Sequence, residues 1–302
     1  MFDLTQPVFG FRHPDIIFVQ DFLLSDLVGG AELSMDALHK ASPVPFTVIR
    51  SQHLKNEHFK NYKDKHWVFG NFAGVHPQAI AYISANFSYS IYEHDYKFCK
   101  YRSIEKHRIE EEHDCDCATS PWGELVKKFF INAKKVWWCS QGQLSRYIDH
   151  IPQISAANNE VLSATFGEDF FENVRPLISS LPSIKKEGWV TLDSDSWIKG
   201  TEDAVSWLKS NRKQYKLLKN LSHKDMLTEL SRAEGFVCLP RGGDVSNRMV
   251  TEAKLLGCEV VHNENVQHTS EEWLNNPDKQ FILNWLYGRR KIFWDQTTQF
   301  IK

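Results

Sequence analysis

The stretch EGFVCLPRGGDVSNRMVTEAKLLGCEVVHN, residues 234–263, decides the fold of this chain. It opens with a short apolar run that Pro240 and two glycines interrupt. Apolar side chains then recur at helical spacing, at Met249, Val250, Ala253 and Leu256. Gly257 ends that segment, and two valines follow. The pattern predicts a strand, a glycine-rich loop, a helix that Ser246 caps, and a second strand over 259–262.

The glycine-rich loop of this stretch has the features of a phosphate site. Gly242 and Gly243 carry no side chain, and a helix behind them turns unpaired N–H groups and partial positive charge toward a ligand. Two acidic residues are nearby, Asp244 in the loop and Glu252 in the helix, and the carboxylate deeper in the helix could accept hydrogen bonds from ribose or sugar hydroxyls. Together they indicate a site for a nucleotide joined to a sugar. The alternative is an ordinary turn, with Arg248 paired to Glu252 on a solvated helix face.

The composition is that of an ordinary globular protein, with 42% hydrophobic and 25% charged residues. A formal net charge of −2 gives no support for nucleic-acid binding. The N-terminus lacks a basic segment followed by an apolar one, and no run of about eighteen apolar residues occurs. We therefore expect a cytoplasmic protein without a transmembrane segment.

Predicted strands and helices alternate in both halves, which favours parallel sheets covered by helices. The expected strands are 15–20, 46–50, 67–69, 79–84, 88–96, 135–140, 161–166, 188–192, 215–218 and 236–239. The length allows two domains of roughly 150 residues each. Residues 176–186, rich in Pro, Ser and Lys, indicate the linker. We expect an N-terminal domain over 1–180, a C-terminal domain over 181–278, and a helix over 279–302 that packs back on the N-terminal domain.

Two features of the first half are candidates for a site. Gly29 and Gly30 precede a predicted helix, so backbone there could approach a phosphate or sugar closely. Glu93, His94 and Asp95 end a predicted strand, and in open α/β sheets ligands bind beyond the carboxyl ends of the strands. The alternatives are a simple turn for the glycines and a solvated loop with a structural histidine.

Cysteines and histidines gather in a polar segment that follows. Cys99, Cys115 and Cys117, with His107 and His113 between them, supply enough soft ligands for zinc. The spacing matches no standard zinc-finger pattern, so reduced thiols in a loop are the alternative. We expect the metal, if bound, to be structural, with Cys99, His107, Cys115 and Cys117 as ligands.

In the second half, Lys199 stands just before a helix predicted over 201–210, with Thr201 as its cap. An ammonium group and a helix N-terminus could act together on a diphosphate. Lys199 therefore joins the candidate site residues.

Three segments resemble those of GT-B glycosyltransferases, most closely the retaining enzymes of glycosyltransferase family 4. LVGGAELSMDAL (27–38) is similar to the family's Gly-Gly-Ala-Glu loop and helix, and WIKGTEDAVSWL (197–208) to its Lys-Gly segment. GGDVSNRMVTEAKLLGCEVV (242–261) resembles the donor-site signature, an acidic residue followed after seven residues by glutamate. The resemblance implies the α/β GT-B fold, two Rossmann-like domains whose parallel sheets face each other across a cleft.

The resemblance also implies roles for individual residues. Gly29 and Gly30 would lie by the donor phosphates and the acceptor. Lys199 would bind the diphosphate, Asp244 would reach the donor sugar, and Glu252 would hold the ribose. The remaining residues of the loop and helix that follow, Gly242, Gly243 and Arg248, belong to the same expected donor site.

His94 would face the reacting sugar. The implied activity is glycosyl transfer of the hexosyltransferase type, from a nucleoside-diphosphate sugar to a hydroxyl of a glycan, lipid or small molecule, with retention. Lys199 and the helix N-termini could stabilise the departing diphosphate without a metal, so no catalytic cofactor is expected.

Two departures from the family pattern keep other functions open. Asp244 stands where the family usually has glutamate, and residues 193–195 hold no arginine where one commonly precedes the lysine. Arg241 or Arg248 could supply that charge. A non-catalytic nucleotide-sugar-binding module is one alternative, and a nucleotide-sugar epimerase or phosphorylase of the same fold is another. A dehydrogenase is disfavoured, because the glycine pair before the first predicted helix lacks the three-glycine dinucleotide spacing.

Overall fold

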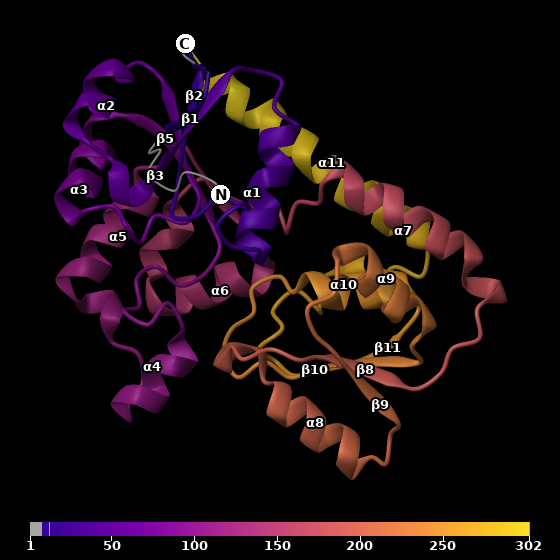
Figure 1. Cartoon of the computed structure of the whole chain (residues 1–302). Helices are drawn as coiled ribbons and strands as arrows, with labels where there is room; N and C mark the ends of the chain where they lie inside the picture. The colour runs from indigo at the N-terminus through magenta and orange to yellow at the C-terminus, as the bar shows by residue number, and fades with distance from the viewer. Residues whose placement is uncertain (1–7, 12, 302) are drawn as a thin grey trace. The chain divides into compact units, whose positions relative to one another are not determined.

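The computed structural model describes residues 8–11 and 13–301 and is shown in Figure 1. The chain divides into two compact units. The N-terminal unit comprises residues 1–167 and 287–302, and the C-terminal unit comprises residues 168–286. Each is an α/β unit built on its own sheet. Among the described residues, no helix is both long enough and apolar enough to cross a membrane.

The N-terminal unit contains a seven-stranded sheet in the order β1-β3-β2-β4-β5-β6-β7. All its strand pairs are parallel except β1 with β3. The central strands are almost entirely buried, as expected of parallel strands covered on both faces. The strands are β1 Val8–Gly10, β2 Ile16–Gln20, β3 Phe46–Arg50, β4 His66–Phe69, β5 Ser88–Glu93, β6 Lys135–Trp138 and β7 Asn159–Val161.

Helices connect these strands, and most begin at a side-chain cap that the sequence supplies. The helices are α1 Gly30–Lys40, α2 Asn56–Asn61, α3 Pro77–Asn86, α4 Ile104–Glu111, α5 Pro121–Ile131 and α6 Gln141–His150. Ser103, Ser120 and Ser140 cap α4, α5 and α6. The C-terminal helix α11 (Lys279–Thr297) joins this unit from Tyr287 onward, and Trp294 Nε1 donates to the Leu38 carbonyl oxygen at 3.0 Å.

The C-terminal unit contains a four-stranded parallel sheet in the order β11-β10-β8-β9. Its strands are β8 Trp189–Leu192, β9 Tyr215–Leu218, β10 Gly235–Cys238 and β11 Glu259–His262. Its helices are α7 Glu168–Ser180, α8 Thr201–Ser210, α9 His223–Arg232 and α10 Arg248–Leu255. Figure 1 shows α8 on one face of the sheet and α9 and α10 on the other. The core between α8 and the sheet contains Trp189, Ala204, Leu208 and Val237.

Two predicted strands are wrong. Residues 79–84 belong to α3, because Pro77 occupies its first turn, His76 caps it, and Ile80 and Ile83 are buried one helical turn apart. The strand expected over 161–166 ends at Val161.

The predicted linker over 176–186 begins inside α7, which carries Pro176 in its interior. Phe170, Phe171 and Val174 of α7 are buried at helical spacing, and the helix packs on α9. The division between the units therefore lies one helix earlier than the domain boundary expected after residue 180.

Candidate functional site

The loop between β10 and α10 carries the donor-site candidates of the C-terminal unit. Asp244 forms an isolated parallel backbone bridge with Val266, so the loop is fixed before the helix begins. The α10 cap is Asn247, one residue beyond the predicted Ser246, and its Oδ1 accepts a hydrogen bond from the Val250 amide at 3.0 Å. The two glycines of the loop precede the bridge and do not belong to the first turn of α10.

Lys199 and Asp244 form an ion pair, with Nζ 3.0 Å from Oδ2. Asn247 Nδ2 donates to the same carboxylate oxygen at 2.7 Å. Burial raises the pKa of Asp244, but the attraction of Lys199 and the hydrogen bonds from Lys199 and Asn247 outweigh it, so the pKa is lowered. The Asp244 carboxylate raises the pKa of Lys199. Both groups are therefore charged at neutral pH, and the lysine side chain is 37% exposed.

Gly200 sets the position of Lys199. It caps α8 with φ of +61°, and a Cβ at this position would overlap the carbonyl oxygen of Leu239. Only glycine fits this left-handed conformation and close approach. Thr201, the predicted cap, instead donates its hydroxyl to the Leu192 carbonyl oxygen at 2.9 Å. The glycine next to Lys199 thus allows the loop after β8 to pack directly on the loop after β10.

Arg241 forms its ion pairs with carboxylates of α8 and not with Asp244. Its Nε donates to Asp203 Oδ2 at 2.5 Å, and its Nη2 donates to Glu202 Oε2 at 2.9 Å, so it is bound to α8. Arg248 is the first residue of α10 and is half-buried, and its charge opposes protonation of His223. Of the two arginines considered for the missing charge, Arg248 lies on the donor-site helix.

Glu252 lies in α10 and is buried, with an exposed fraction of 2%. Its Oε1 is 2.8 Å from His223 Nε2, and this hydrogen bond raises the pKa of the histidine. The solvated helix face considered as an alternative is therefore wrong for Glu252. A buried carboxylate with one oxygen held by an imidazole is positioned to accept a ligand hydroxyl on the other.

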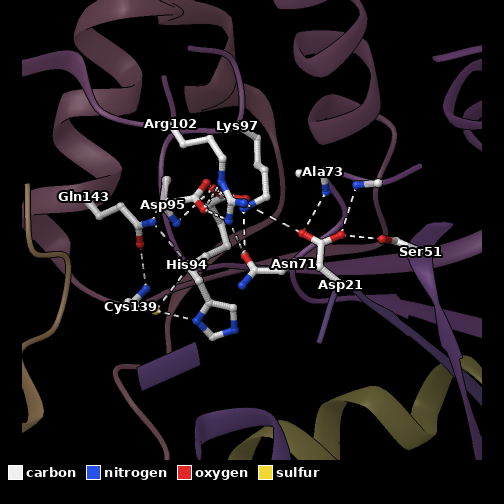
Figure 2. A network of polar contacts seen from close by, with 12 residues as sticks. Asp21, Ser51, Asn71, Ala73, His94, Asp95, Lys97, Arg102, Cys139 and Gln143 are labelled. Atoms are coloured by element: carbon white, nitrogen blue, oxygen red, sulfur yellow. Dashed lines mark hydrogen bonds and ion pairs between the residues drawn. The ribbon is translucent and has the colours of Figure 1, made fainter. Parts of the chain in front are cut away.

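Polar side chains of the N-terminal unit meet at the carboxyl ends of β2, β4 and β5 (Figure 2). Asn71 Oδ1 accepts hydrogen bonds from Lys97 Nζ at 2.9 Å and from Arg102 Nη2 at 3.1 Å. Lys97 Nζ also lies 2.6 Å from Asp95 Oδ1, and Arg102 Nε lies 2.7 Å from Asp95 Oδ2. Asp21, directly after β2, lies 3.8 Å from Arg102 Nη1. The network therefore joins the ends of three neighbouring strands.

Glu93 and Asp95 differ in protonation because their partners differ. Burial raises the pKa of Glu93 to about 8, against the attraction of Lys97. Burial also opposes ionisation of Asp95, but Lys97 and Arg102 hold its pKa down at about 2. Glu93 Oε1 accepts hydrogen bonds from the Asp95 amide and the Tyr147 hydroxyl, both at 3.1 Å. At neutral pH Glu93 is therefore a neutral acid and Asp95 a carboxylate.

His94 directly follows β5 and contacts Cys139, the residue after β6. Its Nδ1 lies 3.4 Å from Cys139 Sγ, and its Nε2 is covered without a hydrogen-bond partner in the described part of the chain. Burial lowers the pKa of His94 to about 3. The imidazole is therefore neutral, and it can donate or accept a hydrogen bond but carries no charge.

The N-terminus of α1 carries the predicted glycine pair. Gly29 is the cap and Gly30 the first helical residue. A Cβ at Gly29 would overlap Glu32 Oε2, because the Glu32 carboxylate folds back over the first turn. Glu32 is buried, which raises its pKa, while Asn71 and Arg102 favour its ionised form. Glu32 thus connects the glycines to the network at the strand ends.

The predicted metal ligands also come together in the N-terminal unit. The ligand atoms of Cys99, His107, Cys115 and Cys117 all lie within 4.8 Å of one another.

No protein-family model matches the chain, and no curated protein sequence matches it. Solved structures do match across almost the whole length. HepE from Anabaena, in complex with UDP and glucose, has a TM-score of 0.52 at 14% identity, covering 96% of both chains. Sucrose-phosphate synthase from Thermosynechococcus elongatus has a TM-score of 0.58 at 12% identity, covering 95% of this chain and 94% of that one.

A third structure, a UDP-forming α,α-trehalose-phosphate synthase from Burkholderia vietnamiensis, has a TM-score of 0.53 at 10% identity, covering 94% of this chain and 99% of that one. The chain has the GT-B glycosyltransferase fold. At these identities the likeness establishes the GT-B fold, so the chemistry has to be argued from the residues of the site.

Several polar residues of this GT-B chain were not predicted as site residues. They are Asp21, Asn71, Lys97, Arg102, His223 and Asn247. Asp21 and Asn71 follow buried strands at once or within two residues, which is the signal that identified His94. Lys97, Arg102 and His223 are placed largely by contacts distant in sequence, whereas Asn247 is the cap of α10, one residue beyond the predicted cap.

Proposed function

We propose that the protein is a glycosyltransferase that moves a sugar from a nucleoside-diphosphate sugar to an acceptor hydroxyl. The observation that carries the proposal is the Lys199–Asp244 ion pair in the loops that precede α8 and α10, with Glu252 buried in α10. HepE was solved with UDP and glucose, and the trehalose-phosphate synthase is UDP-forming. UDP-sugars are therefore the first donors to test.

Lys199 is proposed to stabilise the departing diphosphate. When the bond between the anomeric carbon and the diphosphate oxygen breaks, negative charge develops on that oxygen, and a new bond forms from the anomeric carbon to the acceptor oxygen. The acceptor hydroxyl loses its proton in this step, and the departing diphosphate takes it up. The ammonium group stays charged because Asp244 raises its pKa, and its partial exposure leaves N–H groups available to a ligand. One such donor contributes about 3 kcal/mol in a transition state. Its action would require no metal.

Glu252 is proposed to bind the ribose hydroxyls. His223 occupies Oε1, so the second oxygen would accept from the ligand. A buried carboxylate that loses such a partner is costly, which favours ligands that carry the hydroxyls. Asp244 is proposed to contact the donor sugar while it holds Lys199.

In the N-terminal unit, His94 is proposed to face the reacting sugar, as the resemblance implies, and its Nε2 has no hydrogen-bond partner among the described residues. A neutral imidazole at that position would hydrogen-bond a sugar hydroxyl without changing the charge of the site. Retention at the anomeric carbon is proposed from the three sequence segments that resemble retaining enzymes.

The test begins with thermal unfolding in the presence of UDP-, GDP- and ADP-sugars, because a ligand that binds only the folded state raises the unfolding temperature. A stabilising donor is then assayed for nucleotide release and for transfer to candidate acceptors. Lys199→Ala is expected to slow release by about 10²- to 10³-fold with an unchanged circular dichroism spectrum. The matched control is Lys209→Ala, an exposed lysine of α8.

Equal release by the Lys199→Ala and Lys209→Ala variants would contradict the role of Lys199. Donor binding by the wild-type chain without release or transfer would identify a non-catalytic binding module, and conversion of the donor sugar without transfer would identify an epimerase.

A further inference from the structure

Three thiols surround one imidazole nitrogen between β5 and α5. His107 Nδ1 lies 3.4 Å from Cys117 Sγ and 4.0 Å from Cys99 Sγ, and Cys115 completes the group. Zinc bound tetrahedrally at about 2.3 Å from sulfur and 2.0 Å from nitrogen places these atoms about 3.5 Å apart. The two nitrogen–sulfur distances in the structure, 3.4 and 4.0 Å, are close to this value, so small side-chain shifts would let these atoms bind one zinc ion.

The segment that contains the ligands has little hydrophobic core of its own. In α4 only Ile104 and His107 are buried, and Ile109 is 60% exposed. Cys99 and Cys117, from either end of the segment, are buried against His107. A helix with so few buried apolar side chains needs another source of stability, and metal coordination supplies it in small units of this kind.

The second nitrogen of His107 supports the same interpretation. Nε2 is buried and lacks a hydrogen-bond partner among residues 8–11 and 13–301. Asp116 Oδ1 lies 3.7 Å from it. A carboxylate beyond the free nitrogen of a ligating histidine fixes the ring and its tautomer. A small rotation of Asp116 would complete this hydrogen bond when Nδ1 binds the metal.

A second grouping shares His107 but is less suited to zinc. His107, His113 and Asp116 also have ligand atoms within 4.8 Å of one another. His113 and Asp116 are exposed, and His113 Nδ1 is already hydrogen-bonded to the Asp114 carbonyl oxygen at 2.7 Å. Three sulfur donors and one imidazole are the set that zinc prefers, and three of these four residues, Cys99, His107 and Cys117, are buried.

We propose that the chain binds one zinc ion through Cys99, His107, Cys115 and Cys117. Four protein ligands leave no open position, so the ion is structural. It joins the two ends of the segment 99–117, which also contains Arg102. The ion would thereby hold in place the part of the loop whose arginine contacts Asp95 at the strand ends. This proposal does not depend on the transferase activity.

The test is metal analysis of the full chain purified under reducing conditions. One equivalent of zinc per chain is expected, and after its removal one equivalent of Co²⁺ should give the intense absorption of thiolate-bound tetrahedral cobalt. Cys117→Ser and His107→Ala should lose most of the bound metal. Cys258→Ser, at a buried cysteine of the C-terminal unit, and His113→Ala should retain it.

The wild-type measurements need no variant, so a misfolded Cys117→Ser chain does not decide the outcome. A reduced wild-type chain that holds no zinc and takes up neither Zn²⁺ nor Co²⁺ overturns the proposal. Equal metal loss in the Cys258→Ser and Cys117→Ser variants overturns it as well.

Discussion

Lys199 Nζ lies 3.0 Å from Asp244 Oδ2, although 45 residues separate them in the chain. The two residues follow β8 and β10, which are neighbours in the parallel sheet, so their loops emerge at the same edge. The ion pair gathers opposite charges where a donor diphosphate and its sugar are proposed to bind.

The ion pair predicts a pH-dependent loss of stability. Because the pKa of Asp244 is lower in the folded state, the pair stabilises the fold above the unfolded pKa, and this contribution disappears as the pH falls through the folded pKa. Asp244→Asn should therefore reduce stability at pH 7 by about 1 kcal/mol, since Lys199 is partly exposed, and by less at pH 3. Urea unfolding at both pH values measures this.

The control for Asp244→Asn is Asp195→Asn, a 96% exposed carboxyl group near Lys219. It should change stability little at either pH. A loss for Asp244→Asn that is equal at pH 3 and pH 7 would show that the amide disturbs packing and that charge is not the cause.

The His223–Glu252 contact has the opposite pH dependence. The folded pKa of His223 is raised, so the contact stabilises the fold most fully below the unfolded pKa, and this contribution is lost as the pH rises through the folded value. His223→Asn should therefore cost more stability at pH 5.5 than at pH 8.5. Denaturant unfolding of the wild-type chain and of the His223→Asn variant at both pH values measures this difference in stability. A loss of stability that is larger at pH 8.5 than at pH 5.5 would contradict the prediction.

Glu93 should make the fold less stable as the pH rises from the acid range to about 8. Its folded pKa is about 8, so the folded state retains a proton that the unfolded state has released at lower pH. This group alone makes the stability of the fold fall as the pH rises from the unfolded pKa to about 8. Glu93→Gln keeps a carbonyl oxygen for the Asp95 amide and the Tyr147 hydroxyl, and removes the titration.

The Glu93→Gln variant should accordingly gain stability over the wild-type chain at pH 9 and differ less at pH 5. Thermal unfolding at the two pH values compares them. A variant less stable than the wild type at pH 9 would mean that the ionised carboxylate, with Lys97 beside it, is the preferred state.

His94 should not titrate in the range where histidine usually does. Burial holds the pKa of His94 near 3, so this residue should cause no step near pH 6.5 in the pH profile of sugar transfer. Any step near pH 6.5 in the wild-type profile should therefore also be present in the His94→Asn profile. The substitution should lower turnover more than it weakens donor binding, because the proposed contact is with the reacting sugar. Steady-state kinetics from pH 5 to 9 test both statements.

The alternation of strands and helices could be predicted because parallel strands form short, continuous apolar runs. The segment Ala79 to Ser84 failed as a strand because Ile, Tyr and Ile in a short run resemble one. Its Pro77 and the burial of Ile80 and Ile83 one turn apart mark a helix instead.

Residues of the candidate site could be predicted where one local sequence pattern indicates both the position of a side chain in the fold and its chemical role. Lys199, Asp244 and Glu252 lie on strand-end loops and a following helix that sequence places directly. Lys97 and Arg102 were not predicted, because Asn71, which accepts a hydrogen bond from each, lies 26 and 31 residues earlier in the chain. Arg102 also adopts a left-handed backbone, with φ of 55°, that no local signal announced.

Gly200 permits no methyl group, because the Leu239 carbonyl oxygen occupies that space. The separation between the two loops is therefore set by backbone touching backbone. An alanine at this position would have to spread them, and the lysine next to it would then lose its hold on the aspartate without any change in its own chemistry. One added carbon atom at residue 200 is therefore expected to weaken the ion pair between Lys199 and Asp244.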